Sequence, residues 1–257
     1  MRRTASGFPA ARSTFVSGEI PRSAVPPTFG LSGLASEVRD RRSGTSPGQS
    51  LLVGLSGIDG SGKGFLAGEL CRELERTNLR VALLNVDGWL NLPAIRFSQH
   101  NPAEHFYFHA LRLEEMFSDL VLPLRERRTH RLIAQSVQET ATAYRDYPYE
   151  FCDIDVVLVE GIFIYKRVHR SCFDLAVWID CSFETALERA LRRGQEGLPP
   201  GETIAAYETT YFPAQRLHFQ RDEPRRLADG VMVNDPRLSG RETRRREIGS
   251  AGDRTSW

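Results

Sequence analysis

The stretch "GIDGSGKG", Gly57 to Gly64, decides how the rest of the sequence is interpreted. Up to its last letter it matches the pattern G-x-x-x-x-G-K-[ST], a glycine-rich loop whose backbone N–H groups and lysine bind the phosphates of a nucleotide. The hydroxyl at the last position of that pattern is a ligand of Mg²⁺, but residue 64 is a glycine, which has no side chain. The sequence therefore raises the question of whether this loop still binds a nucleotide and a metal ion.

The segments on either side of the loop provide the context that the motif requires. Residues 51–55, "LLVGL", form a short apolar run typical of a buried strand. After the loop, apolar residues recur at helical spacing until Asn78, which predicts a helix; they are Phe65, Leu66, Leu70 and Leu74. A strand, a glycine loop and a helix in this order favour a phosphate site over a chance glycine-rich turn.

The predicted phosphate-binding residues are Gly57, Asp59, Gly60, Ser61, Gly62, Lys63 and Gly64. Backbone N–H groups of the loop would surround the phosphate oxygens of ATP at the N-terminus of the helix. Lys63 is also a predicted catalytic residue, because its charge would reach the β and γ phosphates.

Further apolar runs alternate with helical patterns along the chain. The predicted strands are residues 80–87, "RVALLNVD"; 154–161, "IDVVLVEG"; 173–180, "FDLAVWID"; and 230–235, "GVMVND". Between them, a helix is predicted to begin at Pro102, with Asn101 as its cap, and another to span residues 182–193 and end at Gly194. This order predicts an α/β fold, a P-loop NTPase-type parallel sheet of about five strands with helices on both faces.

Two acidic residues stand at the ends of predicted strands, on the sheet edge where the loop lies. Asp87 is the predicted general base, which receives the proton of an acceptor hydroxyl in phosphoryl transfer; capping the next turn is its alternative role. Glu160 ends a buried strand, where an unpaired charge is costly, so Mg²⁺ and Lys63 are its predicted partners. Glu160 and Asp87 are the predicted metal-binding side chains, which would hold the ion through its water molecules.

Three arginines lie near the end of the helix predicted over residues 182–193. Arg189 and Arg192 are three residues apart and therefore share a helix face. Guanidinium groups bind phosphate oxygens well, so Arg189 and Arg192 are predicted to be catalytic residues on a closing lid, and Arg193 to bind the nucleotide. A solvated helix end is the alternative interpretation.

Composition limits the other classes of function. The 34 Lys and Arg residues nearly balance the 33 Asp and Glu residues, so no overall field favours nucleic acid or an anionic membrane. The four cysteines lack C-x-x-C spacing, and no apolar run approaches the roughly 20 residues of a membrane span. We therefore expect reduced core thiols, a cytoplasmic protein, and neither nucleic acid nor a membrane as partner. The sequence predicts no particular oligomeric state.

From about Leu51 to Pro236, the chain resembles the uridine kinase and phosphoribulokinase group of P-loop kinases. The likeness rests on "GIDGSGK", on "VDGWL" around Asp87, on "VVLVEGIF" around Glu160 and on "ALERALRR" at the arginines. It implies an ATP-dependent, Mg²⁺-dependent kinase that acts on a small hydroxylated metabolite. The roles given above are those that this resemblance implies for the matching residues.

The candidate acceptor pocket departs from the uridine kinase pattern. His100 stands where that family has a ribose-binding aspartate, and Arg125 replaces a tyrosine that faces the base, although His130 matches. These three residues are the first candidates for contact with the acceptor.

Three further candidates for substrate contact lie near the end of the chain. Tyr207 follows an alanine where the family has a base-reading glutamine. In "YFPAQRLHFQRDEP", Arg216 and His218 are candidates, while apolar packing explains the same segment equally well.

The ends of the chain differ in composition from its centre. Residues 1–50 are rich in Ser, Pro, Gly and Arg and poor in acids, which predicts a disordered tail; a transit peptide is the alternative, but prolines interrupt any amphipathic pattern. Residues 51–236 form the predicted P-loop kinase domain. Residues 237–257, dense in arginine and glutamate, are a second predicted tail.

The predicted function is transfer of the γ-phosphoryl group of ATP to a hydroxyl of a nucleoside-like acceptor, such as uridine or cytidine. Pantothenate, glycerate and a sugar phosphate are alternative acceptors, because Arg125 and Arg131 suit an anionic group. Gly64 motivates a different class, a nucleotide-binding switch without transfer activity. A guanine-reading N-K-x-D stretch is absent, which argues against a GTPase switch.

Overall fold

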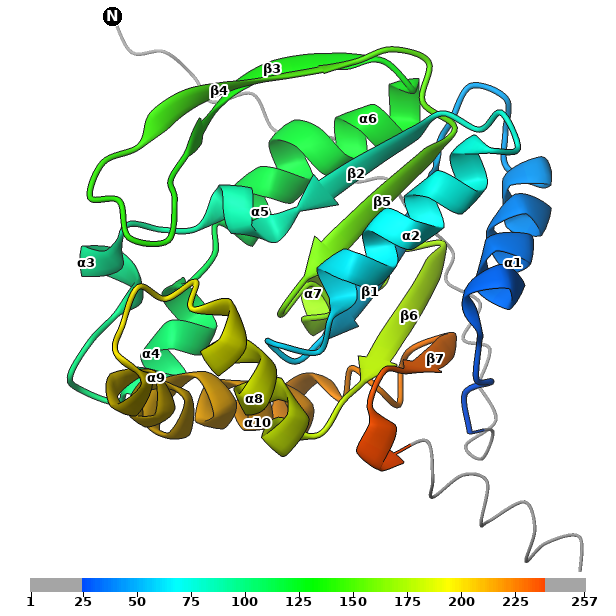
Figure 1. Ribbon diagram of the computed structural model, residues 1–257. Helices are drawn as coiled ribbons and strands as arrows, with labels where there is room; N and C mark the ends of the chain where they lie inside the picture. The colour runs from blue at the N-terminus through cyan, green and yellow to red at the C-terminus, as the bar shows by residue number, and fades with distance from the viewer. Residues whose placement is uncertain (1–24, 239–257) are drawn as a thin grey trace, which may run out of the picture.

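A parallel sheet of five strands lies at the centre of the computed structural model, which describes residues 25–238 (Figure 1). The strands stand in the order β2-β5-β1-β6-β7, so β1 lies between β5 and β6. Their bounds are Leu51–Gly57 for β1, Val81–Asn85 for β2, Val156–Gly161 for β5, Leu175–Asp180 for β6 and Gly230–Val233 for β7. All five predicted strands are confirmed, as is the P-loop NTPase-type α/β fold.

Helices cover both faces of the sheet, because successive residues of its buried strands point to opposite sides. On one face, Val53 and Leu55 of β1 belong to an apolar cluster with α1 (Leu31–Ser43) and α2 (Lys63–Glu75). On the other face, Leu52 belongs to a larger cluster that contains the apolar side chains of the later helices. The core therefore has two layers of helices with the sheet between them.

The later helical segments fill most of the chain between the strands. Their bounds are α3 (Pro93–Arg96), α4 (Pro102–His109), α5 (Leu113–Met116), α6 (Leu122–Arg127), α7 (Arg167–Arg170), α8 (Phe183–Arg193), α9 (Pro200–Ala206) and α10 (Phe212–Asp222), with a 3-10 turn, η1 (Val86–Trp89), and two π segments, η2 (Phe117–Val121) and η3 (Tyr207–Tyr211). The π segments connect α5 to α6 and α9 to α10 without a break, so each forms part of a longer helix.

An antiparallel hairpin, β3 (His130–Ser136) and β4 (Arg145–Phe151), forms a separate two-stranded sheet (Figure 1). Most of its residues are exposed or half-buried, so the alternation of apolar and polar residues that predicts a strand is weak. Tyr149 of β4 stacks on Trp89 of η1 with ring centroids 6.0 Å apart. The hairpin thus packs against η1, the segment that follows β2.

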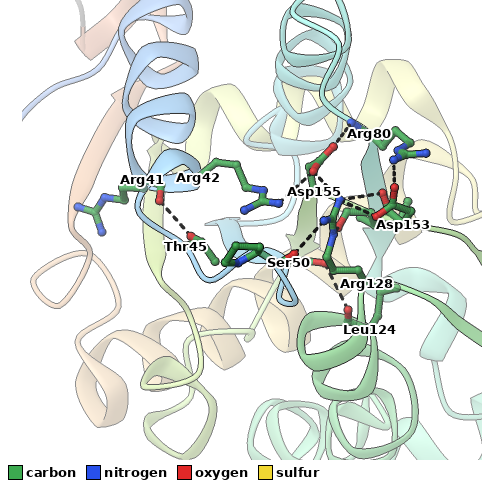
Figure 2. A network of polar contacts seen from close by, with 11 residues as sticks. Arg41, Arg42, Thr45, Ser50, Arg80, Leu124, Arg128, Asp153 and Asp155 are labelled. Carbon is green, nitrogen blue, oxygen red and sulfur yellow. Dashed lines mark hydrogen bonds and ion pairs between the residues drawn. The ribbon is translucent and has the colours of Figure 1, made fainter.

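Helix α1 corrects the prediction of a disordered tail over residues 1–50. Leu34 and Val38 of α1 are fully buried in the apolar cluster on the α2 face. At the helix end, Arg42 donates a hydrogen bond of 3.0 Å to Asp155, which also accepts one of 2.7 Å from Arg128 (Figure 2). The sequence does show this short apolar stripe around residues 31–38, but the prediction rested on the polar composition of the whole segment. Residues 1–24 and 239–257, which fall in the two predicted tails, lie outside the described residues.

The predicted ends of α8 are confirmed, whereas for α4 only the predicted first residue is confirmed. The Ser182 hydroxyl caps α8 by accepting the N–H of Thr185 at 3.3 Å, and Gly194 ends the helix with a φ of 60°. Helix α4 begins at Pro102 as predicted, but the capping role of Asn101 is wrong, because its side chain makes no cap hydrogen bond.

Two findings bear on the predictions from composition. None of the helices within residues 25–238 is both long and apolar enough to cross a bilayer. The four cysteines are free; Cys152 is exposed and the other three are half-buried, so none is the fully buried core thiol that we expected.

Candidate active site

The glycines of the loop between β1 and α2 are required by close approach of other segments. Gly60 has a φ of +74°, and a Cβ atom there would lie 2.5 Å from the carbonyl oxygen of Ala186 in α8. Gly62 has a φ of +83°, and a Cβ atom there would lie 2.4 Å from the side-chain amide nitrogen of Asn234. Only glycine fits both the backbone conformation and the space at these positions.

Side chains from three later segments hold the loop in place. Arg189 of α8 and Asn234, after β7, donate to the carbonyl oxygen of Ser61 at 3.1 and 2.7 Å. Gln215 of α10 accepts the N–H of Asp59 at 3.2 Å. None of these contacts involves the N–H groups of residues 62–64, which meet no hydrogen-bond acceptor among residues 25–238. Unpaired N–H groups at the start of a helix fit a bound anion such as phosphate.

The loop borders a pocket at the carboxyl edge of the sheet, with about 510 Å³ of space that is partly open to solvent. Strand ends, the hairpin turn, the segment after α8 and helix α10 all contribute to it. The lining residues are Asp59, Lys63, Asp87, Leu90, Phe106, Glu139, Ile162, Arg193, Gln195, Glu196, Tyr211 and Gln215. Three of the predicted site residues, from the loop and from the segment after β2, therefore meet in one cavity: Asp59, Lys63 and Asp87.

Asp59 is tied to the segment that follows α8. Its carboxylate accepts hydrogen bonds from the Tyr207 hydroxyl and, at 2.9 Å, from the N–H of Gly60, and Arg193 lies 3.5 Å away. Burial would raise the pKa of Asp59, but the charges of Lys63 and Arg193 and these hydrogen bonds outweigh it and lower that pKa. Asp59 is therefore ionised at neutral pH and links the phosphate loop to α8 and η3.

Asp87 lies in η1, directly after β2, as the position of a general base requires. Its side chain is exposed to the pocket, while the surrounding protein still displaces much of its water. This desolvation raises the pKa of Asp87, reinforced by the nearby charge of Asp59 and opposed by that of Lys63. Its backbone N–H bonds to the Asn85 side chain at 2.7 Å, and no residue among those described occupies its carboxylate with a hydrogen bond. The carboxylate is thus free to accept a proton from a ligand.

Glu160, at the end of β5, faces Gly64 across the start of α2. A Cβ atom at Gly64 would stand 3.3 Å from Oε1 of Glu160, so a hydroxyl at residue 64 would lie beside this carboxylate. Glu160 is 4% exposed, and its carboxylate forms no hydrogen bond within residues 25–238. Burial raises its pKa to about 7, with Asp87 and Asp59 adding to the effect and Lys63 opposing it. A buried carboxylate without a partner fits a cation in its vicinity.

These residues fit Mg²⁺ only if the ion keeps most of its ligands from phosphate and water. Residues 25–238 contain no group of three or more His, Cys, Asp and Glu side chains placed to hold a metal. The buried hydroxyl of Ser61 has no hydrogen-bond partner, and Glu160 and Asp87 surround the start of α2. Because Mg²⁺ commonly takes one or two protein ligands besides phosphate oxygens and water, Ser61, Asp87 and Glu160 are the residues that would hold it.

The arginines of α8 are only partly placed as predicted. Arg189 contacts the loop and Arg193 lines the pocket, so the two residues four positions apart face the site. Arg192 is exposed and donates to the carbonyl oxygen of Glu188 at 3.2 Å. The prediction that Arg192 shares the catalytic face with Arg189 is therefore corrected: Arg193 occupies that position.

Two candidates for acceptor binding lie away from the pocket. Arg125 forms an ion pair of 2.5 Å with Asp174, next to the amino end of β1, which is the opposite edge of the sheet. His130, at the far end of β3 from the hairpin turn, contacts the carbonyl oxygen of Asp119 at 2.7 Å. Both predictions were carried over from a family motif, and the structure corrects them, because Arg125, in α6, pairs with Asp174 and the His130 ring contacts η2.

The other four acceptor candidates also fall outside the pocket lining. His100 is exposed, and Arg216 is exposed with its guanidinium 4.6 Å from the ring centre of Phe183. His218 is buried and bonded to Asp222 at 2.7 Å, so it has a packing role. Tyr207 is buried and contacts Asp59 and, at 2.8 Å, Glu196, so it supports the phosphate loop instead of reading an acceptor.

Six residues of the site that carry polar groups were not predicted from the sequence. They are Glu139, Gln195, Glu196, Tyr211, Gln215 and Asn234. Most lie in turns or in the middle of helices, where no strand end or motif marks them. The sequence does mark Asn234, because this residue stands near the end of the strand predicted over residues 230–235, at the same sheet edge as Asp87 and Glu160.

Asp235 holds the start of α8 through hydrogen bonds to its carboxylate. The contribution of these bonds to stability should depend on pH. It is 2% exposed and accepts the N–H of Ser182 at 2.7 Å and the hydroxyl of Thr185 at 2.8 Å. Burial opposes ionisation, but these bonds lower the pKa of Asp235 from 3.8 to about 2. The stability that this shift contributes is present above pH 3.8 and is lost as the pH falls through about 2.

We therefore expect Asp235→Asn to lower the free energy of unfolding by about 2 kcal/mol at pH 7. The difference from the unmodified protein should shrink as the pH falls from about 4 to about 2. Urea unfolding at several pH values measures this, with Asp40→Asn, a change at an exposed residue of α1, as control. A difference that does not vary with pH would contradict the role of the charge.

The fold and the loop define the class: the chain has the fold of P-loop kinases. No family model matches the chain, and no curated protein matches it. Among solved structures, it is similar to a possible uridine kinase from Bacillus stearothermophilus, with 22% identity, a TM-score of 0.59, and 76% of this chain and 99% of the other covered.

Two further structures are similar to the chain over comparable lengths. One is a candidate fructose transport system kinase from Silicibacter sp. TM1040, with 18% identity, a TM-score of 0.62, and 79% and 98% of the two chains covered. The other is a D-glycerate 3-kinase from Cryptococcus neoformans var. grubii, with 15% identity, a TM-score of 0.54, and 80% and 95% covered. At these identities the likeness establishes the fold.

Proposed function

We propose that the protein is an ATP-dependent small-molecule kinase that transfers the γ-phosphoryl group to a hydroxyl of a metabolite. The observation that carries the proposal is the meeting of Lys63 and Asp87 in one pocket, at the carboxyl edge of a P-loop sheet. Lys63 supplies positive charge beside the phosphates, and Asp87 presents an unoccupied carboxylate. Phosphoryl transfer depends mainly on such positioning and charge neutralisation.

In the proposed reaction, the acceptor hydroxyl gives its proton to the Asp87 carboxylate as its oxygen bonds to the γ phosphorus. The bond between that phosphorus and the β,γ-bridging oxygen breaks, and ADP leaves. Desolvation raises the pKa of Asp87, which makes the carboxylate a stronger base than an aspartate in water. Arg193 and Arg189 hold the loop and the following segment in position. Bound Mg²⁺ would neutralise charge on the β and γ phosphates.

Nucleosides of the uridine and cytidine type are the first proposed acceptors. The similar solved structures are described as kinases for uridine, fructose transport and D-glycerate, which supports a hydroxylated metabolite without selecting one. Pantothenate, glycerate and a sugar phosphate are alternatives. Arg125, which motivated an anionic acceptor, lies at the opposite sheet edge and gives that alternative no support.

A nucleotide-binding protein that does not transfer phosphate is the second candidate, because Gly64 removes a metal ligand. A screen of ADP formation against nucleosides, sugars and organic acids separates the two. Acceptor-dependent ADP formation would support the kinase. ATP binding without ADP formation, whatever the acceptor, would support the second candidate.

Gly64→Ser tests how the metal is held. The new hydroxyl would lie beside Glu160, whose carboxylate must move by a few tenths of an ångström to admit the Cβ atom. We expect the Mg²⁺ concentration needed for ATP binding to fall on the order of 10-fold, because a ligand is restored next to existing carboxylates. Magnesium titrations with ATP, followed by calorimetry, measure this change.

Gly64→Ala is the matched control, because it adds the Cβ atom without the hydroxyl. It should not tighten the Mg²⁺ dependence. Equal behaviour of the serine and alanine variants would mean that another group already fills this position. A lack of Mg²⁺ dependence in all three proteins would favour the non-catalytic candidate.

A further inference from the structure

The pocket contains a carboxylate that the proposed transfer does not use, Glu139. It lies in the turn between β3 and β4 and lines the same cavity as Asp87 and Lys63. Its side chain is 26% exposed, so it is accessible from the cavity without lying in bulk solvent. Across the pocket, a Cβ atom at Gly197 would lie 3.4 Å from Thr140, so the turn reaches the segment after α8.

Arg96, at the end of α3, fixes the position of Glu139. Its guanidinium is 1% exposed; Nη2 donates to the backbone carbonyl of Glu139 and lies 3.1 Å from Oε1 of the same residue. A buried ion pair adds little net stability, but it restricts both side chains to one arrangement. The Glu139 carboxylate is therefore held in place before any ligand binds, which is the property of a recognition residue.

The charges of the pocket select against an anionic acceptor. Among its lining residues, four carboxylates (Asp59, Asp87, Glu139, Glu196) face two cations (Lys63, Arg193). Lys63 stands at the phosphate loop, where the proposed function assigns it to the phosphates of ATP, and Arg193 pairs with Asp59 at 3.5 Å and Glu196 at 3.0 Å.

The acidic residues of the pocket also affect the pKa of Glu139. Burial raises its pKa, Asp87 and Asp59 add to the effect, and Arg96 opposes it. Arg96 is engaged with Glu139 and is not part of the pocket lining. A carboxylate or phosphate on the acceptor would meet these acids with no free cation among the lining residues.

We propose that Glu139 is the acceptor-recognition residue of this pocket, and that it accepts hydrogen bonds from neighbouring hydroxyls of an uncharged sugar or nucleoside. The inference rests on the proposed kinase function. Leu90, Phe106 and Tyr211 provide apolar surface for the ring of such an acceptor.

The test measures transfer kinetics of the full-length chain with two sets of acceptors. The uncharged set is uridine, cytidine, D-fructose and D-ribose, and the anionic set is D-glycerate, pantothenate and fructose 6-phosphate. Transfer to the nucleosides or to the free sugars shows which of these two classes of acceptor the site binds. The variant is Glu139→Gln, and the control is Glu150→Gln, which changes an exposed carboxylate of β4 in the same hairpin.

We expect an uncharged acceptor to be used at least about 100-fold more efficiently than any anionic one. Glu139→Gln should raise the KM for that acceptor by about 10-fold or more, because a hydrogen bond to a charged group is weakened. The KM for ATP should not change, and the control should match the unmodified protein. If uridine is an acceptor, the unmodified protein should use it more efficiently than 2′-deoxyuridine, and Glu139→Gln should lose this preference.

Several results would overturn the inference. A preference for an anionic acceptor would leave the kinase function standing and would show that the carboxylates of the lining do not select the acceptor. An unchanged KM in Glu139→Gln, with an uncharged acceptor in use, would show that Glu139 does not contact it. If the protein binds ATP but transfers phosphate to no member of either set, both the proposed kinase function and the role of Glu139 would be contradicted.

Discussion

Replacing Lys63 by alanine will reduce ATP-dependent transfer by on the order of 10² to 10³ or more, while the protein still folds. Lys63 begins α2 at the phosphate loop and lines the pocket with Asp59 and Asp87. Its loss removes the positive charge aimed at the γ-phosphoryl group, where negative charge must be stabilised during transfer. The side chain is not part of either apolar cluster, so the core is unaffected. Turnover assays together with circular dichroism of the variant measure both outcomes.

Arg72→Ala is the matched control for this change. Arg72 lies on the same helix, but it is exposed and pairs with Glu69. An exposed pair of this kind contributes at most about 1 kcal/mol to stability, and the control should retain its turnover. Unchanged turnover in Lys63→Ala would contradict the assignment of residues 57–64 as a phosphate-binding loop.

The second large effect is expected for Asp87→Asn, which should keep ATP binding and lose about 10² to 10⁴ in the rate of transfer. Asparagine has nearly the same shape as aspartate but cannot receive the proton of the acceptor hydroxyl. The backbone bond between Asp87 and Asn85 does not involve the side chain of residue 87, so the local turn should persist. Single-turnover rates and ATP affinity, measured separately, distinguish loss of chemistry from loss of binding.

Asp146→Asn, which changes an exposed residue of β4, is the control for this substitution and should be neutral. If Asp87→Asn weakened ATP binding and left the single-turnover rate intact, Asp87 would serve only to hold the metal or the local structure and would not be the general base. The raised pKa of Asp87 would then reflect only its burial and the neighbouring Asp59 charge.

The central sheet could be predicted because buried parallel strands are continuous apolar runs that end in recognisable residues. The order of strand, glycine loop and helix placed Lys63 at the sheet edge, and the strand ends placed Asp87 and Glu160 at the same edge. Hairpin β3–β4 left no such signal, because its residues are mostly exposed. Helix α1 was obscured by the polar composition around it.

The acceptor side of the site could not be predicted, for a physical reason. The family motif predicted Arg125 and His130 at the pocket, but Arg125, in α6, pairs with Asp174, and His130 contacts the carbonyl oxygen of Asp119. Glu139 stands in a polar turn, and only the buried contact with Arg96, 43 residues away in sequence, shows that it is held at the cavity. Contacts over such separations leave no local pattern in the chain.

The most direct test of phosphoryl transfer uses ATP labelled with ¹⁸O in its γ-phosphoryl group and follows this label into the products. The protein is incubated with this ATP, Mg²⁺ and the uncharged acceptors, and the products are identified by mass spectrometry. We predict labelled phosphate ester on an acceptor hydroxyl, in an amount equal to the ADP formed, and a yield with Lys63→Ala that is lower by the factor given above. Label found only in inorganic phosphate, or no ADP at all in the presence of every acceptor, would contradict the proposed kinase.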